Sequence, residues 1–254
     1  MRSYRGAVDD TEEFRRQGRR WSLELAADPE VTAHALDLLV QADRHHWTYQ
    51  WTWLGLPIIQ MPPDIVVMQE IIWAQRPDLI IETGVARGGS LVLSASILQL
   101  LGDGAALGID IDIRAHNRAA IENHPLAHRI ELIEGSSVDH DLVAQVRRRA
   151  GEAQRVMVIL DSNHTHEHVL DELNLYADLV TPGQYLVVAD TVVEDLPPQD
   201  HRPRPWGKGD NPATALREWG GLHPEFEADD ALSGKLLLTS SPGGYLRRRP
   251  TDAS

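Results

Sequence analysis

The chain of 254 residues contains no cysteine. This absence excludes disulfide bonds, a thiolate nucleophile, and zinc or iron–sulfur sites that depend on cysteine ligands. Long hydrophobic runs are also missing, because no stretch approaches the roughly 18 apolar residues that a membrane span needs. The N-terminal sequence MRSYRGAVDD has no apolar core of a signal peptide. We therefore expect a cytoplasmic protein without a membrane span.

Cationic residues are few relative to anionic ones. Lys and Arg number 24 against 38 Asp and Glu, so the formal net charge is −14 at pH 7. Such an excess of negative charge repels nucleic-acid backbones and anionic lipid headgroups, so we expect no nucleic-acid partner. At about 150 residues per domain, the length allows one large domain with additions or two small ones.

Short apolar runs alternate with helical patterns through the middle of the chain. The expected strands are residues 79–82, 107–110, 130–134, 156–160 and 185–189. The expected helices between them are residues 89–101, 114–123, 141–150 and 168–179. This alternation predicts an α/β fold of the Rossmann-like type, with a doubly wound, mostly parallel sheet and helices on both faces.

The N-terminal segment has its own helix signals. Asp28 followed by Pro29 is typical of the start of a helix, here one that runs to about Arg44, and a basic helix is expected to precede it. We therefore divide the chain into a helical N-terminal extension, residues 1–50, and a main domain, residues 51–254.

Three further segments have a predicted structure. Residues 45–63 are aromatic and interrupted by prolines, so we expect an ordered loop there, followed by a helix that Asp64 caps. The charged, proline-rich insertion at residues 192–212 is long enough for a working loop or lid. Residues 235–239 and 244–248 are expected to pair as an antiparallel C-terminal hairpin.

A glycine-rich turn follows the first expected strand. Its glycines, Gly84, Gly88 and Gly89, have the spacing GxxxGG, which breaks the GxGxxG fingerprint of dinucleotide-binding proteins. Glu82 would repel a pyrophosphate but suits an ammonium group, and the free N–H groups of the helix that begins near Ser90 suit a carboxylate. S-adenosylmethionine carries both charges, whereas the alternative is a tight turn without a ligand.

The ends of the next two expected strands also carry polar residues. Asp110 can accept hydrogen bonds from both hydroxyls of a ribose. Ser136 or Ser137 can meet an adenine edge, or either serine can simply cap the following helix. A valine in place of Gly88 is expected to block the approach of the cofactor to the turn.

Two aspartates follow the last two parallel strands. Asp161 and Asp190 should converge, because neighbouring strand ends lie about 5 Å apart. Carboxylates that close repel unless a cation lies between them, and Mg²⁺ is commonly held by one or two carboxylates. The alternative is that one Asp caps a helix and the other bonds a loop. His164 is our candidate for a catalytic base, whereas His166 and His168 are expected on a helix face.

Several motifs together carry a family resemblance. They are GLPIIQ from Gly55, MQE from Met68, IETGVARGGS from Ile81, GIDID from Gly108, LDSNHTH from Leu160, and the late NP and GYL elements. In these motifs the chain resembles the rhamnosyl O-methyltransferase and cephalosporin hydroxylase family, whose members depend on S-adenosylmethionine and act in glycolipid and antibiotic biosynthesis. The resemblance extends from about Trp51 to Leu246.

The resemblance implies roles for individual residues. It implies that the methionyl part of the cofactor contacts Glu82, Gly84, Gly88 and Ser90, that Asp110 binds the ribose, and that Asp161 and Asp190 hold Mg²⁺. It also implies a homo-oligomer.

One position departs from the family pattern. Family members often have two adjacent acids after the fifth strand, whereas this chain has Ala189 before Asp190. This departure leaves the remaining metal coordination to Thr191, Asn163 or water.

The resemblance implies an O-methyltransferase that acts on a deoxysugar hydroxyl, in a free sugar or a glycosylated acceptor. Tryptophans 47, 51 and 53 could clasp the sugar together with Arg204, Trp206 and Lys208 of the insertion, or the three tryptophans could simply pack in a core. Two other functions stay open: an oxygenase component similar to cephalosporin hydroxylase, and a cofactor-binding protein without turnover.

Overall fold

The computed structural model describes residues 10–198 and 202–250. Its centre is a seven-stranded sheet with the order β5-β4-β3-β6-β7-β9-β8. The strands are β3 (Leu79–Thr83), β4 (Ala105–Asp110), β5 (Ile130–Glu134), β6 (Val156–Leu160), β7 (Tyr185–Val188), β8 (Phe226–Ala228) and β9 (Tyr245–Arg248). The first five are parallel, and β9 runs antiparallel to both β7 and β8. The predicted fold class is confirmed.

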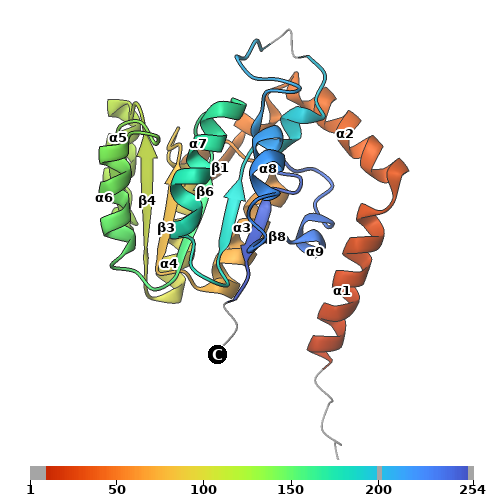
Figure 1. Cartoon of the computed structure of the whole chain (residues 1–254), viewed down its shortest axis with the longest axis horizontal. Helices are drawn as coiled ribbons and strands as arrows, with labels where there is room; N and C mark the ends of the chain where they lie inside the picture. Colours follow the sequence, from red (N-terminus) through yellow and green to blue (C-terminus); the bar gives the residue numbers. More distant parts are fainter. Residues whose placement is uncertain (1–9, 199–201, 251–254) are drawn as a thin grey trace, which may run out of the picture.

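Helices cover both faces of the sheet (Figure 1). They are α3 (Pro62–Gln75), α4 (Gly89–Leu101), α5 (Ala115–Glu122), α6 (His140–Ala150), α7 (His166–Tyr176) and α8 (Pro212–Gly220). Leu79 and Ile81 of β3 pack in one core with α6, α7 and α8, whereas Ile80 packs in a second core with α3 and α4. Successive side chains of a strand point to opposite faces, so the three apolar residues of this fully buried strand contribute to both cores.

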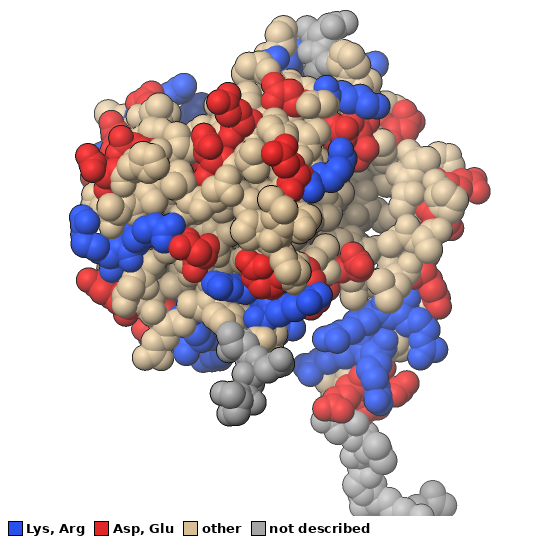
Figure 2. All heavy atoms as spheres, viewed as in Figure 1, with Lys and Arg blue, Asp and Glu red and all other residues tan. Residues whose placement is uncertain are grey.

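The N-terminal helices α1 (Thr11–Ala26) and α2 (Pro29–Asp43) lie beside the sheet, and α1 stands away from it (Figure 1). Asp28 caps α2 as predicted, because its side chain accepts from the amides of Glu30 at 3.0 Å and Val31 at 3.1 Å. Lys and Arg atoms gather on α1 in the space-filling view (Figure 2). None of the helices in the described ranges is both long and apolar enough to cross a bilayer.

The aromatic segment contains more regular structure than predicted. It forms a short hairpin, β1 (Trp51–Trp53) with β2 (Leu56–Ile58), instead of an irregular loop. Leu54 and Gly55 at its tip have φ values of 46° and 95°, as in the two-residue turns that match the twist of a hairpin. Leucine is unusual at such a position, which explains why the sequence pattern did not reveal the turn.

The C-terminal strands pair differently from the prediction. An antiparallel end of the sheet exists, but β9 pairs with β8 and β7, and residues 235–239 form no strand. The reason lies in Asp64, which we expected at a helix cap. Its buried side chain accepts hydrogen bonds from Thr239 and from the Ser240 amide, and these bonds hold residues 239–240 beside α3.

Helix α3 therefore begins without Asp64 as its cap. Met61 occupies the N-cap position without a side-chain hydrogen bond, and Pro62 and Pro63 begin the helix. Since proline has no backbone N–H, two of the groups that normally need a cap are absent at this end. Asp64 is thus free to bind the C-terminal segment.

Candidate functional site

A cavity of about 720 Å³ lies at the carboxyl ends of β3, β6 and β7. The strand order reverses between β3 and β6, and ligands of open α/β sheets bind at such a switch point. The cavity wall includes the glycine-rich turn, the residues after β6 and β7, the aromatic segment, the end of α2, and the insertion. Segments that are far apart in the sequence thus meet at one site.

The glycine-rich turn follows β3 and lines the cavity from Gly84 to Ser90. Gly84 and Gly88 have φ values of +92° and +83°, a conformation that favours glycine. A Cβ atom on Gly84 would overlap the carbonyl oxygen of Asp161, and one on Gly88 would meet the side chain of Ile121. Close packing of the chain itself therefore requires these glycines. Our expectation that valine at Gly88 blocks the cofactor stays a prediction, and the structure adds that valine would also collide with Ile121.

Asp110 holds the glycine-rich turn in place. Its Oδ2 accepts from the amides of Val85 at 2.9 Å and Ala86 at 3.1 Å, and its Oδ1 accepts from the Asp112 amide at 3.1 Å. Asp110 is not among the residues that line the cavity. The structure thus gives Asp110 a structural partner, and its contact with a ribose stays a prediction.

Glu82 is a buried acid directly behind the turn, with 1% of its surface exposed. The hydroxyl of Ser90, which lines the cavity, donates to Glu82 Oε1, whereas Oε2 has no hydrogen-bond partner in the described part of the chain. Burial raises the pKa of Glu82 to about 7, and the Ser90 hydrogen bond opposes this effect only in part. A buried acid with an unsatisfied oxygen is suited to a cationic ligand group.

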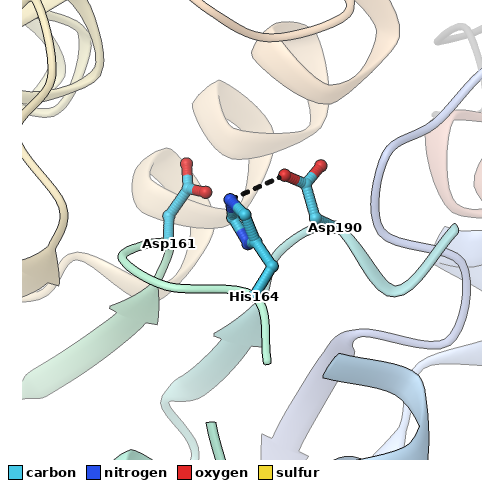
Figure 3. Close-up of side chains that lie close together, drawn as sticks. All are labelled: Asp161, His164 and Asp190. Atoms are coloured by element: carbon cyan, nitrogen blue, oxygen red, sulfur yellow. Dashed lines mark ion pairs between the residues drawn. The ribbon is translucent and has the colours of Figure 1, made fainter. Parts of the chain in front are cut away.

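Asp161, His164 and Asp190 come together beside the turn (Figure 3). One potential ligand atom from each residue lies within 4.8 Å of the others, and His164 Nε2 lies 3.1 Å from Asp190 Oδ2. Asp161 follows β6 and Asp190 follows β7, as the strand-end argument predicted. Asp190 has a φ of 54°, which is rare for a residue with a Cβ and typical of strain held at a functional site.

The electrostatics of this cluster favour a bound cation. Burial raises the pKa of Asp161 well above its ordinary value, and the negative charges of Asp190 and Glu82 raise it further. A cation between Asp161 and Asp190 would reverse the effect of the neighbouring charge. The residues therefore fit a divalent ion.

Thr191, which we expected as a further metal ligand, does not line the cavity. It is 1% exposed, and its hydroxyl donates to the carbonyl of Pro242 at 2.8 Å. The Oδ1 atom of Asn163 accepts from the Thr165 amide at 2.9 Å. Each oxygen keeps a lone pair after its hydrogen bond, so metal coordination by Thr191 or Asn163 stays a prediction.

His166 and His168 lie on different sides of α7. His166 contacts the Thr214 hydroxyl at 2.8 Å and a carboxylate oxygen of Glu218 at 3.2 Å, so it bridges to α8 as a helix-face residue. His168 instead contacts the Ser162 hydroxyl at 3.1 Å and the fully buried Glu172. Glu172 raises the pKa of His168. His168 is thus also a residue of a helix face, one that packs against a buried acid.

Neither serine after β5 caps α6, because Asp139 does so. Its side chain accepts from the amides of Asp141 at 3.0 Å and Leu142 at 2.9 Å. Ser137 is buried and its hydroxyl lies 3.2 Å from His168 Nε2, whereas Ser136 is partly exposed. Contact of Ser136 with an adenine stays a prediction.

Another part of the cavity wall consists of aromatic and cationic residues. Trp47 of the aromatic segment lines it, together with Arg204, Trp206 and Lys208 of the insertion. The ring of Trp206 stands edge-on against that of His164, with centroids 4.7 Å apart. The insertion therefore reaches the proposed catalytic base.

Trp51 and Trp53 do not line the cavity. Trp53 donates to the Ser96 hydroxyl at 3.0 Å, and Trp51 packs edge-on against Trp47 with centroids 5.8 Å apart. For these two residues, the packing interpretation agrees with the structure.

Sequence reasoning missed Asp64 as a cavity residue. Asp64 is 3% exposed, lines the cavity, and also accepts a hydrogen bond from Tyr245 at 2.8 Å. Burial raises its pKa, although these hydrogen bonds oppose the shift. The available signal was an acid directly before the apolar run from Ile65 to Met68.

Comparisons with known proteins give consistent matches. The model of the Rhamnosyl O-methyltransferase/CmcI family matches residues 45–249. A rhamnosyl O-methyltransferase of Mycobacterium tuberculosis (strain ATCC 25618 / H37Rv) is 30% identical over 220 residues, covering 82% of this chain and 85% of that protein. One from Mycobacterium leprae is 31% identical over 219 residues, covering 83% and 91%.

Solved structures share the fold. A structure of CmcI with Mg and SAM has a TM-score of 0.56 and 22% identity, and covers 79% of this chain and 77% of that chain. The O-methyltransferase TomG from Streptomyces achromogenes, in complex with SAM, has a TM-score of 0.51 and 19% identity, and covers 76% and 80%.

Proposed function

Because the chain belongs to the Rhamnosyl O-methyltransferase/CmcI family, we propose that it methylates a hydroxyl of a rhamnose-like deoxysugar with S-adenosylmethionine as donor. The observation that carries the proposal is the meeting of two acidic sites beside one cavity: Glu82 behind the glycine-rich turn, and the cluster of Asp161, His164 and Asp190. The relatives that are 30% and 31% identical carry the name rhamnosyl O-methyltransferase, which supports the sugar acceptor.

The glycine-rich turn fits the methionyl part of the donor. The unpartnered Oε2 of Glu82 would accept from the ammonium, and the first amides of α4, including that of Ser90, would meet the carboxylate. The ammonium would thereby satisfy the buried oxygen that the protein leaves without a partner. We retain Gly84, Gly88 and Gly89 as residues of this site, since they bring the backbone to the cavity wall.

Asp161 and Asp190 would hold a divalent ion, for which we propose Mg²⁺ because hard cations prefer carboxylate oxygens. When bound, this ion lowers the pKa of the acceptor hydroxyl. His164 would serve as the base. Its Nε2 is held by Asp190, which leaves Nδ1 as the nitrogen that can accept a proton. Alignment of the acceptor with the methyl group is expected to contribute more than the base, roughly 7–11 against 3–5 kcal/mol.

The affinity for S-adenosylmethionine is expected to fall as the pH drops below 7. Burial raises the pKa of Glu82 to about 7 in the free protein, so below that pH a proton must leave before Glu82 can pair with the ammonium. The dissociation constant should then rise up to about tenfold per pH unit between pH 7 and pH 5.5. Calorimetry of the metal-free protein measures this slope.

A Glu82→Gln variant isolates the contribution of Glu82 to this pH dependence. It should bind the cofactor about 10- to 100-fold more weakly at pH 7 and show a flatter pH dependence. Glu24→Gln, which changes an exposed acid on α1, should retain the wild-type slope. The same slope in Glu82→Gln would assign the pH effect to another group.

Calorimetry with S-adenosylmethionine, with and without Mg²⁺, followed by a methyl-transfer assay on rhamnosides, tests the whole proposal. We expect binding, turnover that falls on chelation, and recovery when Mg²⁺ is restored. Cofactor binding without methyl transfer to any acceptor would favour a non-catalytic binding protein. Consumption of O₂ with the substrate would favour the oxygenase alternative.

The biological setting and the oligomeric state are proposed from the family resemblance, because the residues of the site do not bear on them. We propose natural-product or glycolipid biosynthesis as the setting and a homo-oligomer as the working form. The division into residues 1–50 and 51–254 also remains a proposal.

A further inference from the structure

We propose that the acceptor sugar carries an anionic group, a phosphate or a carboxylate, which Arg204 and Lys208 of the insertion bind. This inference rests on the methyltransferase function proposed above and narrows its substrate class. The relevant charges are those of the residues that line the cavity, which differ in sign from the net charge of the chain around Arg204 and Lys208.

The charges of the cavity wall do not cancel once their partners are considered. The described lining residues with ionisable carboxylates or cations are Asp43, Asp64, Asp161, Asp190, Arg87, Arg202, Arg204 and Lys208. Asp43 and Arg202 form an ion pair of 2.9 Å and neutralise each other. Asp64 is surrounded by hydroxyl and amide donors, and burial raises its pKa. The proposed divalent ion would balance Asp161 and Asp190.

Arg87, Arg204 and Lys208 then remain as exposed cations without an ion pair in the described ranges, although the positive charge of Lys208 acts on Glu194. In the described ranges, none of the three lies within 4.0 Å of a carboxylate oxygen. Arg87 belongs to the glycine-rich turn, on the cofactor side of the cavity. S-adenosylmethionine adds one net positive charge, since its sulfonium and ammonium outnumber its single carboxylate, and Glu82 would balance that charge. An anionic acceptor would pair with the cations of the insertion.

Arg204 is held in position by aromatic rings rather than by an acid. Its guanidinium lies 5.4 Å from the centroid of the Trp206 ring, and Nη2 donates to the Tyr49 hydroxyl at 3.2 Å. These contacts orient the guanidinium while leaving most of its N–H donors available. A guanidinium in this state can bind phosphate or carboxylate oxygens in a bidentate manner.

Arg204 and Lys208 lie on either side of Trp206 in the sequence, and Trp206 contacts the proposed base. The ring of Trp206 meets that of His164 at a centroid distance of 4.7 Å. An acceptor whose hydroxyl reaches the cluster of Asp161, His164 and Asp190 would therefore extend its other end toward the insertion. The anionic group would then lie away from the methylated hydroxyl, where Arg204 and Lys208 can bind it.

Three acceptors with the same sugar test the inference: phenyl rhamnoside, 4-carboxyphenyl rhamnoside, and rhamnose with a nucleoside diphosphate on its anomeric carbon. We expect kcat/KM at least about tenfold higher for an anionic acceptor than for phenyl rhamnoside. Whichever of the two anionic acceptors reacts faster identifies the group as a carboxylate or a phosphate. A faster reaction of neutral phenyl rhamnoside would overturn the inference.

Variants of the insertion test the assigned residues. Arg204→Gln and Lys208→Gln should each lose about 10- to 100-fold in kcat/KM for the anionic acceptor and a much smaller factor for phenyl rhamnoside. Arg148→Gln, an exposed arginine on α6 outside the cavity, should change neither value. Equal losses with both acceptors would overturn the inference, because they would indicate a role in folding or turnover.

Calorimetry with S-adenosylmethionine separates a failure of this inference from a failure of the proposed function. Each insertion variant should bind the cofactor with the wild-type affinity. Cofactor binding and methyl transfer that favour the neutral rhamnoside would reject the anionic acceptor and retain the methyltransferase. Absence of both cofactor binding and turnover would reject both proposals.

Discussion

Replacing Asp161 by asparagine is expected to lower kcat by about 10²- to 10⁴-fold and to change the affinity for S-adenosylmethionine only a few-fold. The substitution keeps the size of the side chain but removes one of the two carboxylates proposed to hold the metal. It also removes a carboxylate that interacts with Asp190, so the cluster loses much of its attraction for a cation. Single-turnover kinetics together with calorimetry would measure the two effects separately.

Asp171→Asn provides the matched control, because Asp171 is an exposed residue of α7 outside the cavity. It should retain wild-type turnover. Equal losses of turnover and of cofactor affinity in Asp161→Asn would contradict the proposed role. Such a result would place Asp161 in the cofactor site rather than at the acceptor.

Replacing Gly84 by alanine is expected to destabilise the folded protein by about 3–5 kcal/mol. The new Cβ would overlap the backbone carbonyl of Asp161, and neither backbone can move without disturbing the pairing of β3 with β6. The φ of +92° adds the strain that any side chain has in this conformation. Since domains are stable by about 5–15 kcal/mol, much of the protein would unfold at mild denaturant concentrations, which urea titration would detect.

Gly102→Ala separates the overlap from the strain. Gly102 has a similar φ of +87°, but a Cβ there would meet nothing within 4 Å. We expect a loss of about 1–2 kcal/mol, which corresponds to the strain alone. Equal losses in the two variants would show that the contact between the turn and Asp161 contributes little to stability.

The central sheet could be predicted from the sequence because its signals are local. The central parallel strands are short apolar runs, and β3, β4, β5 and β6 are each followed by an α-helix with a turn between them. Several predicted bounds, such as those of β5 and β6, agree with the structure. Strands that are buried on both faces leave little ambiguity once helices separate them.

The segments that the sequence did not reveal depend on long-range contacts. The C-terminal segment is held beside α3 because Thr239 and Tyr245 donate to Asp64, residues more than 170 positions away. No local pattern records such a pairing. The buried partnership of His168 with Glu172 was missed for a related reason, since a charged residue at helical spacing is usually exposed.

The candidate site was only partly predictable. The rule that ligands bind beyond the strand ends located Asp161, His164 and Asp190, because it depends on topology alone. It could not reveal which nearby oxygens were already occupied. Asp110 and Thr191 have suitable chemistry, but both also bind the backbone, and these contacts are seen only in a structure.

The ion pair between Arg202 and Asp43 has a consequence for engineering, because it joins the insertion to the end of α2 at the cavity wall. The proposed methyl-donor site lies at strand ends, whereas the insertion belongs to chain outside the sheet. Replacing the insertion by that of a relative should therefore change the preference for the acceptor and leave the affinity for S-adenosylmethionine unchanged. Such a chimera needs Arg202 and Asp43, or another compatible ion pair at these positions, to connect the exchanged insertion to α2.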